Sequence, residues 1–246
     1  MGANVPFGLV QLGPSNIPQS WDWCSGYHVS DSTIIGFSHT HLSGTGIGDL
    51  GDINLMPTTA DDVTLARGKV GGDYSTGFFS LFRRETEKVR PGYYAVHLDR
   101  YNVDVELTAT QRVGFHKYTF PAGAEARIVL DLTNGQAWDK LTEASLTIES
   151  DTVISGYRYS KGWANDQKIY FTMVFSKPTQ IDESDTTQSA KDCGILSAAA
   201  KLEGGLTGLT ITSNDQLYLV PYFGNTENTP LYVKVALSPV SIENAK

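Results

Sequence analysis

The chain has 246 residues, of which 40% are hydrophobic and 11% aromatic, so it can bury a sizeable core and an intrinsically disordered chain is excluded. Its formal net charge is −8, from 27 acidic and 19 basic residues, and no cluster of lysines and arginines offsets it, which excludes nucleic acid as a partner. No apolar run approaches the length of a membrane-spanning helix, so a transmembrane segment is also excluded.

The first distinctive segment is 21–52, WDWCSGYHVSDSTIIGFSHTHLSGTGIGDLGD. It holds two Trp, one Tyr, three His, four Asp and six Gly in 32 residues. A core strand does not suit that mixture, because so many polar groups are costly to bury without partners. Glycine lets the backbone approach a ligand, while Trp and Tyr offer flat apolar faces with a polar edge. The segment therefore predicts the wall of a polar binding site.

Strand-like segments recur between turn signals along the rest of the chain. The clearest is 103–110, where apolar side chains at alternate positions fall on one face and polar side chains on the other. Further strands are expected at 126–132, 152–159, 169–176, 206–212, 216–223 and 231–237. The pattern predicts an all-β fold, a large antiparallel β-sandwich of the supersandwich type with few or no helices.

Helical signals are scarce. Segment 191–202 is rich in alanine, but Gly194 and the lack of a 3.6-residue stripe allow a short helix at most. At the C-terminus, Ser241 is a favourable N-cap and Glu243 lies in the first turn, where the helix dipole favours a negative charge. We therefore expect one β-sandwich domain over 1–240 and the start of a helix over 241–246.

The chain has two cysteines, Cys24 and Cys193. Two cysteines cannot form the disulfide framework that holds many small secreted domains together. Their number allows either one bridge between them or two unpaired thiols, and the sequence leaves both open.

Four aspartates of segment 21–52 are candidates for acid–base chemistry, since glycoside hydrolysis commonly uses two carboxyl groups that flank the scissile bond. Asp49 and Asp52 lie in the glycine-rich part, and Asp22 and Asp31 lie upstream. Aspartate also caps turns in glycine-rich loops, which explains the same pattern without catalysis. No catalytic residue is therefore assigned.

The motif His39-Thr40-His41 presents two imidazoles on one face if it is extended, and Asp49 is a possible third ligand for a metal ion. One alternative is thus a small metal-dependent hydrolase that uses His39, His41 and Asp49. The other interpretations are hydrogen bonds to Ser, Thr and Asp neighbours or contact with sugar hydroxyls. No metal ligand is assigned.

The expected substrate-binding residues are concentrated in segment 21–52, because its aromatic rings suit stacking on a pyranose. They are Trp21, Trp23, Cys24, Ser25, Tyr27, His39, His41, Ser43, Gly44 and Asp49. A second polar loop, 160–167, contributes Trp163 and Gln167 at the edge of the site or at a domain interface. For Trp21 and Trp23 the alternative is an apolar plug at one end of the core, and His116 is expected to be a structural histidine.

Segment 21–52 resembles the signature near the N-terminus of the glycoside hydrolase family 92 mannosidases. Three more stretches resemble the family in the same order, at 91–121, 155–178 and 236–246, and 5–14 (VPFGLVQLGP) is similar to its usual opening. The resemblance implies a two-domain plan, an N-terminal β-sandwich joined by a linker helix to a larger helical barrel. The chain resembles only the first domain, so 241–246 is interpreted as the start of that linker.

The resemblance also implies a function. Family members are exo-acting enzymes that remove terminal α-linked mannose with inversion, and their calcium and catalytic carboxylates belong mainly to the barrel. The implied partners are mannose-containing glycans and the C-terminal barrel domain of the same polypeptide, and the implied location is secreted, periplasmic or at the cell surface. This chain alone is then expected to be inactive and to form one wall of an interdomain cleft. A free-standing carbohydrate-binding module is the remaining alternative.

Overall fold

The regular structure of the chain is almost entirely β. The computed structural model describes residues 2–42, 44, 46–61, 63–68, 76–179, 207–227 and 229–246. Within these residues the only helices are three short 3-10 helices, η1 (Trp21–Trp23), η2 (Arg84–Thr86) and η3 (Glu243–Ala245). None of the described helices is long and apolar enough to cross a membrane. The prediction of an all-β fold with few helices is confirmed.

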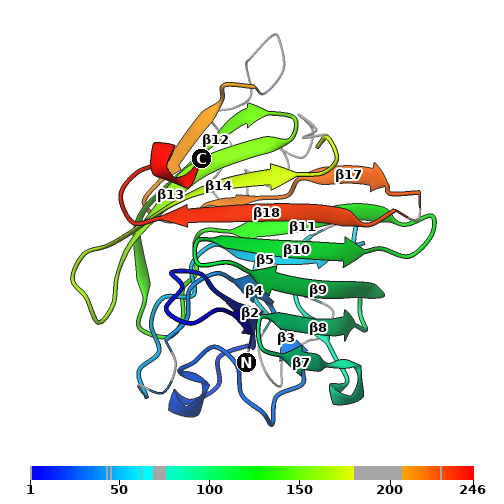
Figure 1. Ribbon diagram of the computed structural model, residues 1–246, viewed down its shortest axis with the longest axis horizontal. Coiled ribbons are helices and arrows are strands. Elements are labelled where there is room, and N and C mark those ends of the chain that lie inside the picture. Colours follow the sequence, from blue (N-terminus) through cyan, green and yellow to red (C-terminus); the bar gives the residue numbers. More distant parts are fainter. Residues whose placement is uncertain are drawn as a thin grey trace.

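The larger sheet has nine antiparallel strands in the order β15-β12-β13-β14-β18-β10-β9-β8-β7. Their bounds in chain order are β7 (Lys88–Arg90), β8 (Tyr93–Leu98), β9 (Val103–Ala109), β10 (Val113–Thr119), β12 (Lys140–Ser150), β13 (Val153–Lys161), β14 (Gln167–Phe175), β15 (Thr210–Ser213) and β18 (Leu231–Ser238). Figure 1 shows β18 at the centre of this sheet, where it joins β14 to β10.

The smaller sheet has seven strands, ordered β1-β2-β4-β5-β11-β16, with β17 also paired to β11. Their bounds are β1 (Ala3–Asn4), β2 (Gln11–Ser15), β4 (Gly36–Ser38), β5 (Asn54–Thr58), β11 (Glu125–Asp131), β16 (Tyr218–Leu219) and β17 (Tyr222–Asn225). A separate two-stranded sheet pairs β3 (Thr33–Ile34) with β6 (Ser80–Leu81).

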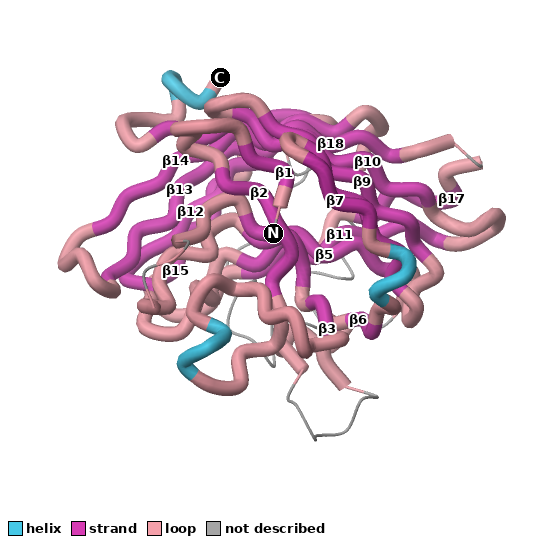
Figure 2. Tube along the Cα trace, turned by 60° about the horizontal axis from the view of Figure 1, so that its bottom comes forward, coloured by secondary structure: helices cyan, strands magenta, loops and turns pink. Residues whose placement is uncertain are grey.

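The two large sheets enclose one apolar core. Buried side chains from both, such as Leu55 and Leu130 of the smaller sheet and Val105 and Phe171 of the larger one, belong to a single packed cluster. In Figure 2 the larger sheet curves around the smaller one, with β12–β15 on the left and β7, β9 and β10 on the right. Two layers of antiparallel strands around one core make a β-sandwich, as the alternating pattern predicts.

Most expected strands are present with shifted ends. β9 has the predicted alternation, with Val103, Val105 and Leu107 buried and Asp104 exposed. The expected strand 216–223 is divided into β16 and β17, because Pro221 has no amide hydrogen for a ladder and instead accepts a hydrogen bond from Ile128 N at 3.1 Å. The expected strands did not include β12, although Ala144, Leu146 and Ile148 alternate along it and are buried.

The C-terminus forms a single 3-10 turn where the sequence predicts the start of a helix. The Ser241 hydroxyl accepts a hydrogen bond from Asn244 N at 3.3 Å, and η3 follows as a single 3-10 turn. Segment 191–202 and Cys193 lie outside the described residues, so the short helix stays a prediction and the choice between a Cys24–Cys193 bridge and two unpaired thiols stays open.

Candidate functional site

The centre of the candidate site is the segment 40–52 between β4 and β5, here called the glycine loop. Its two ends are fastened together over a few residues. His39 N donates to Asp52 O at 2.9 Å and Gly51 N donates to Thr40 O at 3.0 Å. The Thr40 hydroxyl donates to Asp52 Oδ2 at 2.6 Å and accepts from Asp52 N at 2.8 Å. The loop therefore leaves the sheet through a closed neck, which consists of His39, Thr40, Gly51 and Asp52. The other glycines of the loop lie between the two sides of this neck.

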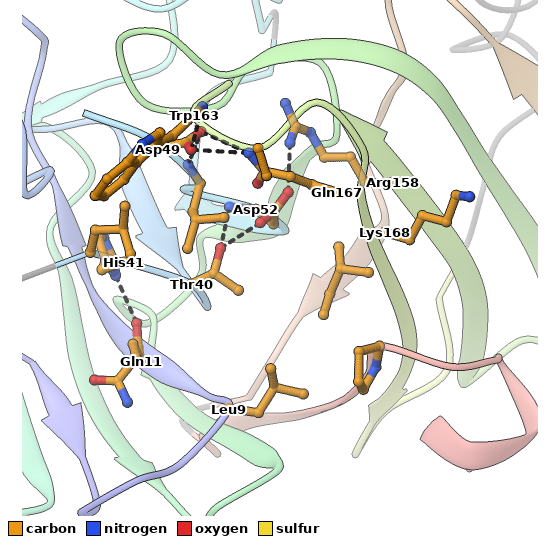
Figure 3. Close-up of a pocket in the computed structure, with 15 residues that line it drawn as sticks. Leu9, Gln11, Thr40, His41, Asp49, Asp52, Arg158, Trp163, Gln167 and Lys168 are labelled. Atoms are coloured by element: carbon orange, nitrogen blue, oxygen red, sulfur yellow. Dashed lines mark hydrogen bonds and ion pairs between the residues drawn. The ribbon is translucent and has the colours of Figure 1, made fainter. Parts of the chain in front are cut away.

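A cavity of about 700 Å³ lies between the glycine loop, the start of β2 and the loop that joins β13 to β14. Figure 3 shows the lining side chains converging on it from these segments. The lining residues are Leu9, Gln11, Thr40, His41, Leu42, Asp49, Leu50, Asp52, Arg158, Trp163, Ala164, Gln167, Lys168, Ile169 and Pro239. Four residues predicted from the sequence, His41, Asp49, Trp163 and Gln167, thus meet at one cavity.

Asp49 joins the glycine loop to the β13–β14 loop. Its carboxylate accepts hydrogen bonds from Trp163 N at 2.9 Å and from Gln167 Nε2 at 3.0 Å. Gly162 allows this approach, because a Cβ atom there would lie 2.1 Å from Asp49 Oδ1. Leu50 N donates to the same carboxylate at 2.9 Å. Asp49 is therefore an acceptor that holds two loops in place.

A buried arginine lies behind Asp49. Arg158, on β13, is 1% exposed, and its guanidinium binds Asp52 Oδ1 at 2.5 Å, the Asp139 carboxylate, and Leu132 O at 2.9 Å. The two carboxylates hold the pKa of Arg158 above its ordinary value, so it stays charged. Burial raises the pKa of Asp139, which also accepts from the Ser160 hydroxyl at 2.6 Å. Alternate residues of a strand face the same side, so Arg158 lies on the core side of β13 with Ile154. The alternation along 152–159 could have predicted this position for Arg158.

The two histidines of the His39-Thr40-His41 motif have different surroundings. His41 lines the cavity, donating through Nδ1 to Gln11 O at 2.7 Å and accepting at Nε2 from the Ser38 hydroxyl at 2.9 Å. Burial lowers the pKa of His41 to about 4, so the ring is neutral near pH 7. His39 is fully buried, and its Nε2 lies 2.9 Å from His116 Nε2. His116 is thus structural, as predicted, and only one of the two motif imidazoles faces the cavity.

The described residues do not support the metal-dependent alternative. They contain no group of three or more His, Cys, Asp or Glu side chains arranged to hold a metal ion. His39 is enclosed, and both ring nitrogens of His41 already have protein partners. Asp49 and Asp52 accept hydrogen bonds or an ion pair from the protein itself. The surface that the cavity presents to a ligand is mainly apolar and comes from residues such as Leu9, Ile169 and Pro239.

The aromatic residues of 21–27 lie beside the glycine loop but do not line the cavity. Trp23 donates from Nε1 to Asp31 Oδ2 at 2.7 Å, and its ring stacks on His28 with 4.0 Å between centroids. The Tyr27 hydroxyl lies 3.0 Å from both carboxylate oxygens of Glu87, and burial raises its pKa. Trp21 is 74% exposed. Trp23 and Tyr27 are thus held by protein partners, and Trp21 points to solvent.

Glycines set the distance between 21–27 and the glycine loop. A Cβ atom on Gly48 would lie 3.4 Å from the Cα of Cys24, and one on Gly26 would lie 2.9 Å from the His41 ring. Cys24 and Ser25 are half-buried there, and Gly44 is exposed in the described part of the loop. Ser43 lies outside the described residues. The predicted substrate-binding set is therefore divided. His41 and Asp49 line the cavity, the residues from Trp21 to Tyr27 lie on η1 and the turn after it, and His39 is buried away from both groups.

Two large exposed side chains at the same end were missed from the sequence. Phe7 is fully exposed and has a φ of 58°, which is strained for a residue other than glycine. The turn after Phe7 contacts the cavity wall, since Gly8 O accepts from Gln11 Nε2 at 2.8 Å. Trp138 is 66% exposed, and its backbone N donates to Gly48 O at 3.0 Å. An exposed ring on strained backbone at Phe7, together with the exposed ring of Trp138, points to a contact surface.

Comparison with known families gives one description over nearly the whole chain. Residues 1–238 match the glycosyl hydrolase family 92 N-terminal domain. The chain is also similar to a curated protein of Arthroderma benhamiae named as an uncharacterized secreted glycosidase, with 28% identity over 159 residues. That alignment covers 62% of this chain and 20% of the relative.

Solved structures agree with this description. The chain is similar to a family GH92 α-mannosidase of Bacteroides thetaiotaomicron, solved alone and with mannoimidazole, with a TM-score of 0.83 and 30% identity. The match to the mannoimidazole complex covers 99% of this chain and 31% of the solved one. An inverting mannosidase of the same species, with a TM-score of 0.65, 21% identity and 99% and 29% coverage, supports the fold alone. The chain thus spans about a third of the solved proteins it matches.

Proposed function

Since the chain belongs to glycosyl hydrolase family 92 and is its N-terminal domain, we propose that it acts as part of an exo-α-mannosidase that removes terminal α-linked mannose from glycans. The resemblance of segment 21–52 to the family's mannosidase signature supports this, as does the solved α-mannosidase that matches at 30% identity. The chain covers only 31% of that protein. The proposed partner is therefore a C-terminal barrel domain of the same polypeptide.

The role proposed for this domain is one wall of an interdomain substrate cleft. The carrying observation is the arrangement of exposed aromatic side chains around one end of the sandwich. Phe7, Trp21, Trp138 and Trp163 are between 59% and 102% exposed, and all four lie on or next to segments that contact the glycine loop or its cavity. Large apolar side chains in water at one place mark a surface that is covered by a partner or ligand.

The acid and the base are proposed to come from the barrel. An inverting pair needs one carboxylic acid and one carboxylate about 6.5–9.5 Å apart with a water molecule between them. Asp49 and Asp52 do not suit these roles, because Asp49 fastens two loops and Asp52 neutralises Arg158. Both carboxylates are engaged in interactions that hold the structure of this wall together.

Calcium is proposed for the complete enzyme, where it would help to bind and distort the sugar. The described residues of this chain do not fit such a site, since no cluster of three acidic or histidine side chains is present among them. The ion is therefore assigned to the barrel, and this chain's residues shape the cleft around the sugar. An extracellular location is proposed by analogy with the secreted relative.

The test is steady-state kinetics of the two-domain enzyme with an aryl α-mannoside. Trp163→Ala removes an exposed ring at the cavity, and a ring half covered by sugar contributes about 1–3 kcal/mol. We expect kcat/KM to fall about tenfold. Val89→Ala is the matched control, because Val89 is an exposed apolar residue on β7, away from the glycine loop. Unchanged kinetics for both Trp163→Ala and Trp21→Ala would contradict the cleft assignment.

A free-standing carbohydrate-binding module would behave differently. Such a module binds mannosides by itself, whereas one wall of a cleft has little affinity without the other wall. Isothermal titration of the chain with methyl α-mannoside and α-linked mannobiose separates the two functions. We expect no heat of binding at millimolar sugar.

A further inference from the structure

A chain of buried hydrogen bonds connects the neck of the glycine loop to the opposite sheet. His39 follows β4 of the smaller sheet, while His116 and Tyr118 lie on β10 of the larger one. His39 Nδ1 lies 2.6 Å from Ile53 O, His39 Nε2 lies 2.9 Å from His116 Nε2, and His116 Nδ1 lies 2.8 Å from the Tyr118 hydroxyl. All three side chains are 0% exposed.

The positions of the hydrogens in this chain follow from the partners. A carbonyl oxygen only accepts, so His39 carries its hydrogen on Nδ1 and donates to Ile53 O. In a neutral ring His39 Nε2 is then an acceptor, and His116 must donate from its own Nε2. The Tyr118 hydroxyl consequently donates to His116 Nδ1. Burial lowers the pKa of both imidazoles and raises that of the phenol, which keeps the three groups neutral in this arrangement.

His39 connects this chain of hydrogen bonds to the glycine loop. Its ring is bound to Ile53 O, its backbone N donates to Asp52 O at 2.9 Å, and its backbone O accepts from Gln11 N at 2.8 Å. His39, at one end of the neck, therefore contacts the other end through Asp52 and Ile53 and contacts strand β2 beside the cavity through Gln11. Gly114 of β10 makes room for the ring, because a Cβ atom there would lie 2.7 Å from His39 Cδ2.

We propose that His116 and Tyr118 are positioning residues that act through His39 to fix the neck of the glycine loop. The importance of this positioning for substrate binding rests on the proposed cleft, whereas the fixing of the neck by His116 and Tyr118 does not. Neither side chain reaches the cavity. Shifting the neck leaves a buried nitrogen or hydroxyl without a partner, and that cost selects one position for the loop that carries Asp49.

The first test is the tautomers of the wild-type histidines, read from ring ¹⁵N chemical shifts in NMR spectra at pH 7. The expected result is hydrogen on Nδ1 of His39 and on Nε2 of His116. A charged ring in either residue, or the opposite tautomer for His39, would overturn the proposal. This measurement needs no variant and no enzymatic activity, so its result is independent of the mannosidase assignment.

The second test is amide hydrogen exchange in Tyr118→Phe, which removes one hydroxyl and keeps the ring. Loss of a buried partner is expected to speed exchange at the neck amides of His39, Gly51 and Asp52 about tenfold relative to β12–β13 amides of the same variant. The matched control is Tyr101→Phe, since Tyr101 is 5% exposed and its hydroxyl bonds with Thr58 and the Phe79 backbone, away from the neck.

The pattern of exchange decides the outcome. Selective acceleration at the neck in Tyr118→Phe, with none in Tyr101→Phe, supports the positioning role. Uniform acceleration across the sandwich would mean that Tyr118 contributes only to global stability and would overturn it. Unchanged neck amides would overturn it as well.

Discussion

Replacing Arg158 with methionine should severely destabilise the domain. Arg158 is 1% exposed and neutralises Asp52 and Asp139, whose side chains are 6% and 0% exposed. Methionine fills most of the volume but leaves two buried carboxylates without their cation. Removing one partner of a buried ion pair costs about 3–5 kcal/mol. For a domain of this size that lowers Tm by about 6–20 °C.

The assay is urea denaturation followed by tryptophan fluorescence, with thermal melts as a second readout. The triple variant Arg158→Met, Asp52→Asn, Asp139→Asn is the informative partner, because it removes the buried charges together with the arginine. We expect it to be more stable than Arg158→Met alone. If the single variant is as stable as the parent chain, Arg158 is not the cation that fastens these loops and the reasoning fails.

Three further results are expected. Burial lowers the pKa of His39 and of His41 from 6.5 to about 4, so the unfolded chain binds protons that the native chain rejects between these values, and each of these two histidines should reduce stability by about 2 kcal/mol from pH 7 to pH 5 in urea titrations. His116, whose pKa burial also lowers, adds a loss of the same sign; a flat profile would contradict this. Gly162→Ala should lower Tm and enlarge the cavity opening, since its Cβ would lie 2.1 Å from Asp49 Oδ1. Gly92→Ser, with no atom within 4 Å of the Cβ position, should lose stability only through the strain of its φ of 73°; equal decreases of Tm in the two variants would refute the clash. Trp23→Phe should cost about 1 kcal/mol of stability through its lost bond to Asp31, and Trp23→Ala should cost more, because it also removes the ring that stacks on His28; a melting temperature for Trp23→Ala equal to that of the parent chain would contradict this.

The sequence was sufficient for the fold class because alternation reports which face of a strand is buried. Strand β9 shows this, with Val103 and Val105 buried and Asp104 exposed. The strand β12 has the same alternation, with Ala144, Leu146 and Ile148 buried, but the expected strands did not include it. Its other face buries Ser145 through hydrogen bonds to Ile211 O and Thr212. The burial of Ser145 has no hydrophobic period to detect, whereas the strand itself does.

The site was predicted only in part, for a related reason. Composition located the glycine loop, and His41 and Asp49 do line the cavity. The Trp23 ring, by contrast, stacks on His28 and binds Asp31, which lie only five and eight residues further along the chain, but the composition of the segment does not show which of its polar side chains pair with Trp23. Whether Trp138 is exposed depends on how a loop packs against Gly48, a contact ninety residues away in the chain. Such long-range contacts decide which polar or aromatic residue faces a ligand.

The central claim is that this chain is one wall of a mannosidase cleft and supplies neither acid nor base. The most direct measurement is hydrolysis of an aryl α-mannoside, with calcium present, by the purified chain alone and by the polypeptide that includes the barrel. We expect turnover only by the longer polypeptide, with release of β-mannose as an inverting enzyme requires. Turnover by the chain alone that survives repurification and is lost in Asp49→Asn or Asp52→Asn would contradict it.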